Sequence, residues 1–401
     1  MTSKKLTHFI LAAMILGIVG GYLIHQFGAE SGLSKQYVSY VSLLTDIFLR
    51  LIKMIIAPLV FTTLVVGISR MGDASTIGRI GLKTFSWFIA MSTVSLLLGL
   101  FMVNLLDPGV GVNLPIPELG SSTGLSKGGF DLTQFVQHIF PTSIVEAMAK
   151  NEILQIVVFA VFFGVAAGGM GSRAMLRITT AVMKFAPVAV FAAVSTVIAE
   201  NGVGILMTYG KFMLSFYGSI LILWLVIVLI SALVLKSRVF ELVSMLRQPV
   251  LLAFSTASSE AAYPMTLEQV ERFGCKKKIA SFVLPVGYSF NLDGSMMYCS
   301  FATIFIAQVY SIEMELSQQL LMLLVLMVTS KGIAGVPRAS LVVIAATLSQ
   351  FNLPEAGVLL ILGVDHFLDM ARSATNVLGN GLATAVISKW EGELEPHHSS
   401  Q

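Results

Sequence analysis

Apolar runs long enough to cross a membrane recur along most of the chain. Runs of about 18 or more apolar residues are typical of transmembrane helices, whereas a soluble protein with one buried helix has a single such run. The pattern predicts eight spanning helices joined by polar segments. They lie at residues 8–26, 37–69, 83–106, 152–171, 175–199, 207–236, 279–309 and 357–390.

Two apolar stretches do not fit a spanning helix. In 318–350, two apolar arms of 13 residues flank "KGIAGVP". Each arm gives about 20 Å of helix, too short for a hydrocarbon core of about 30 Å. In 248–272, an apolar and an amphipathic arm flank the polar stretch "STASSEAAYP". Both patterns predict re-entrant hairpins, because irregular backbone at membrane depth must be buried in protein or line a water-filled cavity.

Each predicted hairpin precedes a span that contains Asn and Gly: "NLDGS" in the seventh span and "NVLGNG" in the eighth. We expect both spans to be interrupted there, which would give two inverted repeats with a binding site near the membrane centre. The expected fold is an all-α membrane protein with eight transmembrane helices and two re-entrant hairpins. Residues 107–150 are expected to form an extramembrane loop, and the tail "GELEPHHSSQ" a disordered end with only a weak metal signal.

Composition agrees with a polytopic membrane protein. Hydrophobic residues make up 56% of the chain and charged residues only 12%, about half the charged fraction of soluble proteins. Lys and Arg gather in alternate connecting segments, which places both termini in the cytoplasm by the positive-inside rule. The two cysteines, Cys275 and Cys299, are expected to be packing residues. The lipid bilayer is therefore the expected surrounding, and a nucleic-acid partner is not expected.

The eighth span carries the strongest chemical signal. Ionisable residues within a membrane helix are functional by default, although such charges also pair across helices to hold a bundle together. Arg372 offers a planar fork suited to a carboxylate, and Asp369 could hold an ammonium group. The pair suits an acidic amino acid, and Arg372 alone suits a plain dicarboxylate. In a third interpretation, Asp369 only neutralises Arg372. Helical spacing puts six polar residues on one stripe: Asp365, Asp369, Arg372, Ser373, Asn376 and Asn380.

The predicted hairpin tips and the seventh span add complementary groups. Ser258 and Ser259 offer hydroxyls beside backbone amides, which suits a second carboxylate. The glycines of "KGIAGVP" would let the second tip expose carbonyl groups and move as a gate. In the seventh span, Asn291 and Asp293 supply oxygens for a cation. Glu260, in the first tip, could carry a proton or only cap the hairpin.

These motifs, in this order and spacing, resemble those of the dicarboxylate/amino acid:cation symporters. The resemblance rests on "STASSEAAYP", "GYSFNLDGS", "SKGIAGVP" and "LGVDHFLDMARSATNVLGNG", and extends more loosely to "LIKMIIAPLVFTTLVVGI". It implies a homotrimeric secondary transporter of elevator type in a prokaryotic inner membrane. Spans one, two, four and five would form the scaffold, and the other spans and both hairpins the moving part. The chain divides into six spans in 1–236, the core transport domain in 248–390 and a cytoplasmic tail in 391–401.

The resemblance also implies site residues. Arg372 would bind the distal carboxylate of the substrate and Asp369 its amino group. The full expected substrate set is Arg372, Asp369, Asn376, Ser373, Ser258, Ser259, Ser295, Val336 and Ser340. The expected cation set is Asn291, Asp293, Ser289, Gly287, Asn376, Asn380, Ser330 and Ser92, with sodium as one possible occupant. No organic cofactor is expected.

Departures from the family pattern concern the coupling ion. Sodium-coupled relatives have Asp at the position of Asn380, and they have Tyr and Thr where this chain has Phe88 and Met91. Many relatives have Ser where Glu260 stands. These differences favour proton coupling, with Glu260 or Asp293 as the carrier. Arg338, next to the second tip, either adds a positive group at the gate or extends toward water.

Other classes of protein fit the sequence less well. An intramembrane aspartyl protease would need two facing Asp residues, for which Asp293 and Asp365 are candidates, but neither lies in a G-x-G-D motif. The sequence also lacks H-E-x-x-H, so no enzyme is expected. A channel would favour rings of repeated polar residues over one asymmetric stripe. Within transporters, a C4-dicarboxylate symporter is the main alternative, because "GNG" after Asn376 is similar to those carriers.

Overall fold

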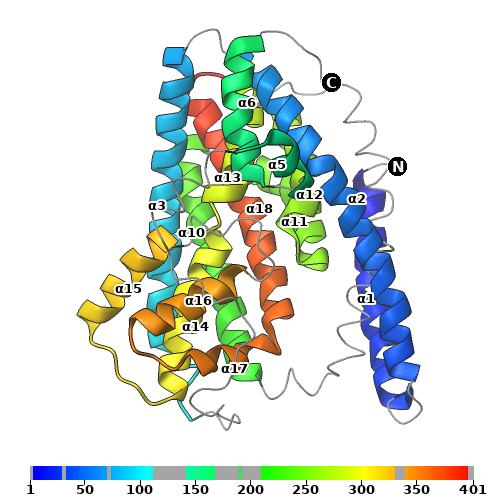
Figure 1. The fold of residues 1–401 in the computed structure, drawn as a ribbon, viewed down its shortest axis with the longest axis vertical. Helices are drawn as coiled ribbons and strands as arrows, with labels where there is room; N and C mark the ends of the chain where they lie inside the picture. The colour runs from blue at the N-terminus through cyan, green and yellow to red at the C-terminus, as the bar shows by residue number, and fades with distance from the viewer. Residues whose placement is uncertain are drawn as a thin grey trace.

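The structure is a computed structural model that describes residues 3–28, 33–69, 74–111, 141–150, 152–167, 188, 191, 209–329 and 339–395. Within these residues the chain is helical, apart from turns and one isolated backbone bridge. The start of α1 and the end of α18 lie toward the same end of the molecule, at the top of Figure 1. The predicted all-α fold is therefore confirmed for the described residues.

The N-terminal helices form one side of the molecule. α1 (Ser3–Gly28) and α2 (Leu33–Ser69) run side by side, and α2 also packs against α6 (Ile153–Ala167) (Figure 1). A short helix, α5 (Ile144–Lys150), lies against α6. The prediction of an extramembrane loop over 107–150 is thus wrong at its end, where these residues form a helix and Ala147 is buried.

Helix α18 (Asp365–Trp390) lies at the centre of the remaining helices. Every residue of 370–388 is buried, so the part of the polar stripe from Arg372 to Asn380 lies inside the protein. The long helix α3 (Ala74–Leu106) packs mainly against α14 and closes another side of the bundle. The helices that surround α18 are α10 (Gly210–Leu235), α11 (Arg238–Thr256), α12 (Ser259–Arg272), α13 (Lys277–Phe290) and α14 (Asp293–Val309).

The first predicted hairpin is present with longer arms than expected. α11 and α12 pack against each other and are joined only by Ala257 and Ser258. Ala257 has a left-handed backbone, with φ of 48°, and the Ser258 hydroxyl caps α12 by accepting a hydrogen bond from the Ala261 amide at 3.3 Å. Residues 238–247, expected to connect span and hairpin, are the first half of α11. Most of the predicted polar tip therefore belongs to the two helices, because Ser258 caps α12 directly after Ala257.

The second predicted hairpin is described in its arms. α15 (Leu316–Thr329) and α16 (Ala339–Gln350) contact each other, and α16 also packs against α14. The predicted tip, with Ser330, Val336 and Arg338, lies outside the described residues. Its proposed role as a gate stays a prediction.

The two predicted helix interruptions have different outcomes. The seventh span is broken as expected, since α13 ends at Phe290 and α14 begins at Asp293. In the eighth span the prediction is wrong, because α18 continues through "NVLGNG" without a break. The break comes earlier, at Gly363 and Val364, between α17 (Val358–Leu362) and α18; the short 3-10 turn η2 (Glu355–Gly357) precedes α17.

The glycines of "NVLGNG" serve close packing instead. A Cβ atom added to Gly379 would stand 2.2 Å from the Asp293 carboxylate, and one on Gly381 would stand 2.5 Å from Leu246. Glycine in a helix costs about 1 kcal/mol relative to alanine, and here it lets α14 and α11 approach the backbone of α18. The same residues that suggested a break therefore mark contacts between helices.

Four described helices are long and apolar enough to cross a membrane: Phe9–Gln26, Ser75–Leu106, Gly210–Leu235 and Arg238–Thr256. The seventh predicted span is not among them because it is broken into α13 and α14. The eighth is not among them because α18 carries the polar stripe. The fifth predicted span, 175–199, lies almost entirely outside the described residues. The count of eight spans stays a prediction.

The chain end packs back onto the helices, and residues 390–395 are called the C-terminal clasp below. Glu391 forms ion pairs with Arg79 at 3.0 Å and with Lys83 at 2.6 Å, both on α3. The ring of Trp390 lies edge-on to the ring of Trp87, with centroids 5.5 Å apart. The clasp therefore ties the end of α18 to the start of α3.

Backbone pairing holds the other half of the clasp. Leu394 forms a bridge with Cys275, and the Glu395 amide donates to the Gly274 carbonyl at 2.9 Å. Glu393 forms ion pairs with Lys276 and, at 2.5 Å, with Lys278. The prediction of a disordered tail is therefore wrong for 391–395, because pairing partners from the α12–α13 connection order these residues. His397 and His398 lie outside the described residues.

The clasp gives a pH-dependent prediction. Hydrogen bonds from Lys276 and Lys278 hold the pKa of the Glu393 carboxyl below its ordinary value. A carboxyl with a lowered pKa stabilises the fold above its ordinary pKa, and the stabilisation is lost as the pH falls through the folded value. We expect Glu393→Gln to lower unfolding stability by about 1 kcal/mol at neutral pH, and this difference to shrink below about pH 4.

Thermal unfolding in detergent at several pH values measures this difference. Glu268→Gln is the matched control, because Glu268 pairs with Arg272 on an exposed helix surface. A loss that stays constant from neutral to acidic pH would show that the Glu393 charge does not stabilise the clasp.

Candidate functional site

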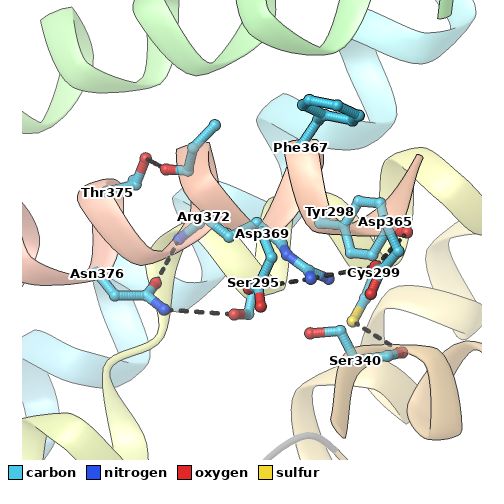
Figure 2. A network of polar contacts seen from close by, with 12 residues as sticks. Ser295, Tyr298, Cys299, Ser340, Asp365, Phe367, Asp369, Arg372, Thr375 and Asn376 are labelled. Carbon is cyan, nitrogen blue, oxygen red and sulfur yellow. Dashed lines mark hydrogen bonds and ion pairs between the residues drawn. The ribbon is translucent and has the colours of Figure 1, made fainter. Parts of the chain in front are cut away.

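The polar stripe of α18 is organised around Arg372. Its side chain is 2% exposed, and its Nη2 atom lies 3.1 Å from Asp365 Oδ1 and 3.0 Å from Asp369 Oδ1 (Figure 2). The guanidinium carbon stands 4.1 Å from the ring centre of Tyr298 on α14. A cation over an aromatic face is attracted by the ring, more strongly when water is excluded. Two carboxylates and one ring therefore hold the guanidinium at one end.

The two carboxylates have different surroundings. Asp365 is buried and also accepts a hydrogen bond from the Tyr298 hydroxyl at 3.2 Å. The side chain of Asp369 is 39% exposed, and among the described residues it contacts Arg372. Asp365 is thus the buried counter-ion of Arg372. Asp369 has the accessible carboxylate that a ligand can reach.

Part of the guanidinium has no partner. The Nε and Nη1 atoms of Arg372 are buried, and neither makes a hydrogen bond with the described residues. Buried charged donors without acceptors are unfavourable by a few kcal/mol, about 1–3 for a neutral group and more for a charged one. A ligand carboxylate that accepts from one of these donors would remove part of the penalty. The Nε–H and Nη1–H bonds point to different sides of the guanidinium, so a carboxylate bound by two parallel hydrogen bonds would pair one of these donors with Nη2.

Asn376 joins α18 to the broken helix. Its Oδ1 atom accepts a hydrogen bond from the Gly294 amide at 2.9 Å, and its Nδ2 donates to the Ser295 hydroxyl at 3.3 Å (Figure 2). On the opposite side of α18, the Trp224 indole donates to the Thr375 hydroxyl at 2.8 Å. The helix carrying Arg372 is therefore fixed in rotation by α14 and α10.

A second polar cluster lies deeper, at the break between α13 and α14. Asn291 donates from Nδ2 to Asp293 Oδ2 at 3.1 Å and to Asn380 Oδ1 at 3.2 Å. The Ser95 hydroxyl on α3 lies 3.4 Å from Asp293 Oδ1. All of these side chains are at most 1% exposed. A carboxylate at this depth needs a cation or a proton to balance it.

Several oxygens of this cluster are open to a cation. Asn291 Oδ1 and Ser289 Oγ are buried without hydrogen bonds to the described residues. Oxygen atoms of carboxylate, amide and hydroxyl groups are the ligands of hard cations. Within the described part of the chain, no three His, Cys, Asp or Glu side chains gather into a metal-binding group. Asp293 is the one carboxylate among the side chains named here, and its single negative charge suits a proton or a monovalent cation. We call this group of residues the candidate cation cluster.

The candidate cation cluster includes most of the expected cation residues. Gly287 lies against it, because a Cβ added there would stand 2.3 Å from Asn380 Oδ1 and 3.3 Å from the Phe88 ring. Ser92 is buried one turn from Ser95 on α3. The contact with Asp293 comes from Ser95, which the sequence analysis did not single out.

The other expected substrate residues divide into two groups. Ser295 lies beside Asn376, and Ser340 on α16 is near the site, where its carbonyl lies 4.0 Å from Cys299 Sγ (Figure 2). The Ser258 hydroxyl is used as the cap of α12. The hydroxyls of Ser259 and Ser373 make no hydrogen bonds within the described residues. Val336 and Ser330 lie outside the described residues.

Glu260 stands in the first turn of α12 and is partly buried. A negative charge at this position interacts favourably with the helix dipole, which agrees with a capping role. Partial burial also suits a proton carrier. The position of Glu260 therefore fits either role.

Sequence reasoning missed three residues that shape the two clusters, Tyr298, Ser95 and Trp224, and it missed the role of Asp365. Tyr298 was inside the motif "GYSFNLDGSMMYC" but carried no polar spacing signal. Asp365 was on the stripe, yet only the fold shows that Tyr298 makes it the more fixed of the two carboxylates. Ser95 and Trp224 come from α3 and α10, and no spacing relates those helices to α18.

The chain is similar to known transport proteins over nearly its whole length. The sequence model of the sodium:dicarboxylate symporter family matches residues 6–390. A proton/sodium-glutamate symport protein of Geobacillus stearothermophilus is 40% identical, over 98% of this chain and 96% of the relative. A proton/glutamate-aspartate symporter of Escherichia coli (strain K12) is 41% identical, over 96% and 93%. A C4-dicarboxylate transport protein of Geobacter sp. (strain M21) is 37% identical, over 98% and 91%.

The close packing at Gly379 gives a test of the candidate cation cluster. In Gly379→Ala, the new Cβ would stand 2.2 Å from the Asp293 carboxylate, so the carboxylate must move away from Asn291. We expect cation affinity, measured by calorimetric titration or by the ion dependence of thermal unfolding, to fall about tenfold or more, a change of at least about 1.4 kcal/mol.

Gly218→Ala on α10 is the matched control, because nothing lies within 4 Å of a Cβ added there. It should keep the cation affinity of the parent protein. Equal cation affinity in Gly379→Ala and the parent would exclude Asp293 from cation binding.

Proposed function

The chain belongs to the sodium:dicarboxylate symporter family, and we propose that it carries acidic amino acids, aspartate or glutamate, inward together with protons or sodium ions. Its relatives at 40% and 41% identity are named as glutamate and glutamate-aspartate symporters, which supports this substrate class. The role is transport of a small acidic molecule, and no enzymatic reaction is proposed.

One observation carries the choice of substrate. The buried Arg372 has free donors at Nε and Nη1, while the partly exposed Asp369 stands 3.0 Å from its Nη2 atom. In the proposal, one of the free donors, paired with Nη2, binds the distal carboxylate of the substrate, and Asp369 binds its ammonium group. Asp365 remains as the counter-ion that keeps Arg372 in place when no substrate is bound. The remaining substrate carboxylate would lie toward Ser258 and Ser259 of the first hairpin and Asn376 of α18.

A C4-dicarboxylate is the alternative substrate. It would use the same Arg372 donors but needs no acidic partner for an ammonium group. The relative at 37% identity named as a C4-dicarboxylate transport protein supports this alternative. The role of Asp369 therefore separates the two substrates.

A protease dyad is disfavoured by the separate partners of its two candidate residues. Asp293 binds Asn291 in the cation cluster, whereas Asp365 binds Arg372 and Tyr298. Two aspartates that share a catalytic water must face each other, and each of these is held by a different set of neighbours.

The coupling ion is proposed to be a proton, with sodium as the alternative. Asn380 is neutral, and the Phe88 ring stands beside Gly287 in the candidate cation cluster. These two residues reduce the number of oxygens available to sodium. Asp293 and Glu260 are the proposed proton carriers.

The proposed movement follows the division of the helices. α1, α2 and α6 would form the fixed scaffold, and α18 with the helices packed around it would move across the membrane. A homotrimer in the prokaryotic inner membrane, with both termini in the cytoplasm, is the assembly we propose. The domain division into 1–236, 248–390 and the tail 391–401 is part of this proposal, with α11 beginning at Arg238.

The first test concerns Asp369. We expect Asp369→Ala to weaken aspartate binding by about 2 kcal/mol, or roughly thirtyfold, because the ammonium group loses its partner. Succinate binding should stay within about threefold, a difference of roughly 0.7 kcal/mol. Competition of unlabelled aspartate and succinate against labelled aspartate, with purified protein in liposomes, measures both affinities.

Asp365→Asn is the comparison variant, since it removes the buried counter-ion and should lower thermal stability whichever substrate is bound. If Asp369→Ala leaves the preference between aspartate and succinate unchanged, Asp369 has no role in binding the amine. The dicarboxylate alternative would then be favoured.

The second test concerns the coupling ion. In liposomes with a pH gradient, acid outside, and no sodium, we expect uptake of aspartate, and Glu260→Gln should reduce it about tenfold or more if Glu260 carries the proton. Glu268→Gln, one helix turn or more away on α12 and paired with Arg272, is the control. Full uptake from a sodium gradient with the pH gradient collapsed would exclude obligatory proton coupling.

A further inference from the structure

A groove of about 870 Å³ lies on the outer side of the bundle, between α1 and the helices α10, α11 and α18. Ligand pockets in proteins typically measure about 300–1,000 Å³. Its walls include Leu221, Leu225 and Phe240, whose side chains are largely exposed. Exposed apolar side chains on helices of this hydropathy face lipid. The groove is therefore open to the hydrocarbon of the bilayer.

The floor of the groove is formed by the side of α18 that faces away from Arg372. Ala374 and Leu378 of α18 line it, next to Trp224 of α10. These residues lie within a turn or two of Arg372, which points to the opposite side of the helix toward α14 (Figure 2). A molecule in the groove would thus contact the helix that carries the candidate site.

Among the described residues that line this apolar groove, Arg247 is the one cation. Arg247 is exposed and forms no ion pair or hydrogen bond with the described residues. It stands in the middle of α11, itself a helix apolar enough to cross a membrane, about 13 Å along the axis from Arg238. A charged side chain beside lipid hydrocarbon is costly unless it finds an anion or water.

The geometry of α11 directs this cation toward the membrane surface. Helical side chains tilt toward the N-terminal end of their helix. In α11 that end is Arg238, which donates to the Glu395 carbonyl of the C-terminal clasp at 3.0 Å. Ser244, three residues before Arg247 and on the same face, also lines the groove. The groove therefore has a polar end near the surface and apolar walls.

We propose that the groove binds an anionic phospholipid, with its phosphate on Arg247 and Ser244 and one acyl chain between α1, α10 and α11. Arg binds a phosphate with two parallel hydrogen bonds. An anionic lipid neutralises the single positive charge, whereas a zwitterionic lipid brings its own cation and leaves the charge uncompensated. Charge complementarity thus selects the anionic headgroup.

The position of the lipid gives it a consequence for transport, which rests on the proposed function. Leu11 belongs to α1, in the proposed scaffold, and the other walls belong to the proposed moving part. A bound acyl chain fills the gap between them. Lipid binding itself does not depend on that movement, so the two can be tested apart.

Trp224 provides a reporter inside the groove. The chain has 3 tryptophans, and replacing Trp87 and Trp390 by Phe leaves Trp224 as the sole emitter. The protein is reconstituted in phosphatidylcholine vesicles with increasing fractions of phosphatidylglycerol brominated on its acyl chains, since bromine quenches indole fluorescence on contact. We expect the quenching to show a preference of about fivefold for phosphatidylglycerol over brominated phosphatidylcholine.

Arg247→Gln in this background should abolish the preference while leaving quenching by both lipids. Arg272→Gln is the control, because Arg272 is an exposed cation of α12 that pairs with Glu268 outside the groove. Equal quenching by the two lipids in the parent protein, or an unchanged preference in Arg247→Gln, overturns the proposal. So does the absence of quenching, which would mean that another part of the assembly covers the groove. Aspartate uptake is measured in parallel: its loss with the preference retained counts against the proposed function alone.

Discussion

The Arg372 guanidinium stays charged at any physiological pH, so the helices around it must supply negative charge and electron-rich surface inside an apolar bundle. They do so from two directions, with Asp365 and Asp369 on the same helix and the Tyr298 ring from α14. This requirement explains why α14 must lie close beside α18. It also explains why two donor atoms of Arg372 can remain without partners among the described residues, because the charge of the guanidinium is already balanced by its two carboxylates.

Balancing this charge requires α14 to start where α13 ends. A continuous helix from 277 to 309 would carry the Gly294 amide inside its own hydrogen-bond ladder, whereas the break frees it to donate to Asn376. The same break places Asn291 and Asp293 next to Gly379, which has no side chain to obstruct them. The Arg372 site and the candidate cation cluster thus share one structural feature. A cation or proton at Asp293 would reach the substrate residues through Asn376 and the start of α14.

The outer surface of α18 is fixed by different contacts. Trp224 holds Thr375, and Ala374 and Leu378 form the floor of the groove that contains Arg247. At the end of the helix, the C-terminal clasp binds the start of α3 and the start of α13. One face of α18 therefore carries the polar site, and the opposite face contacts apolar neighbours and lines the groove. The end of α18 is anchored to two other helices of the same bundle.

The sequence by itself determined the class of the protein and which polar residues share one face of its last predicted span. Long apolar runs can only be membrane helices, and the offsets from Asp365 to Asn380 place those side chains on one stripe, because helical periodicity is local. Local pattern also found the break at Asn291. It failed at "NVLGNG", because glycine and asparagine weaken a helix and permit close packing equally well, and only the neighbours Asp293 and Leu246 decide between them. The roles of Asp365 and Asp369, the contact of Ser95 with Asp293, the order of residues 391–395 and the groove at Arg247 depend on residues far apart in the chain. Those relations were decided by tertiary packing, since no spacing along the sequence records which helices come to lie side by side.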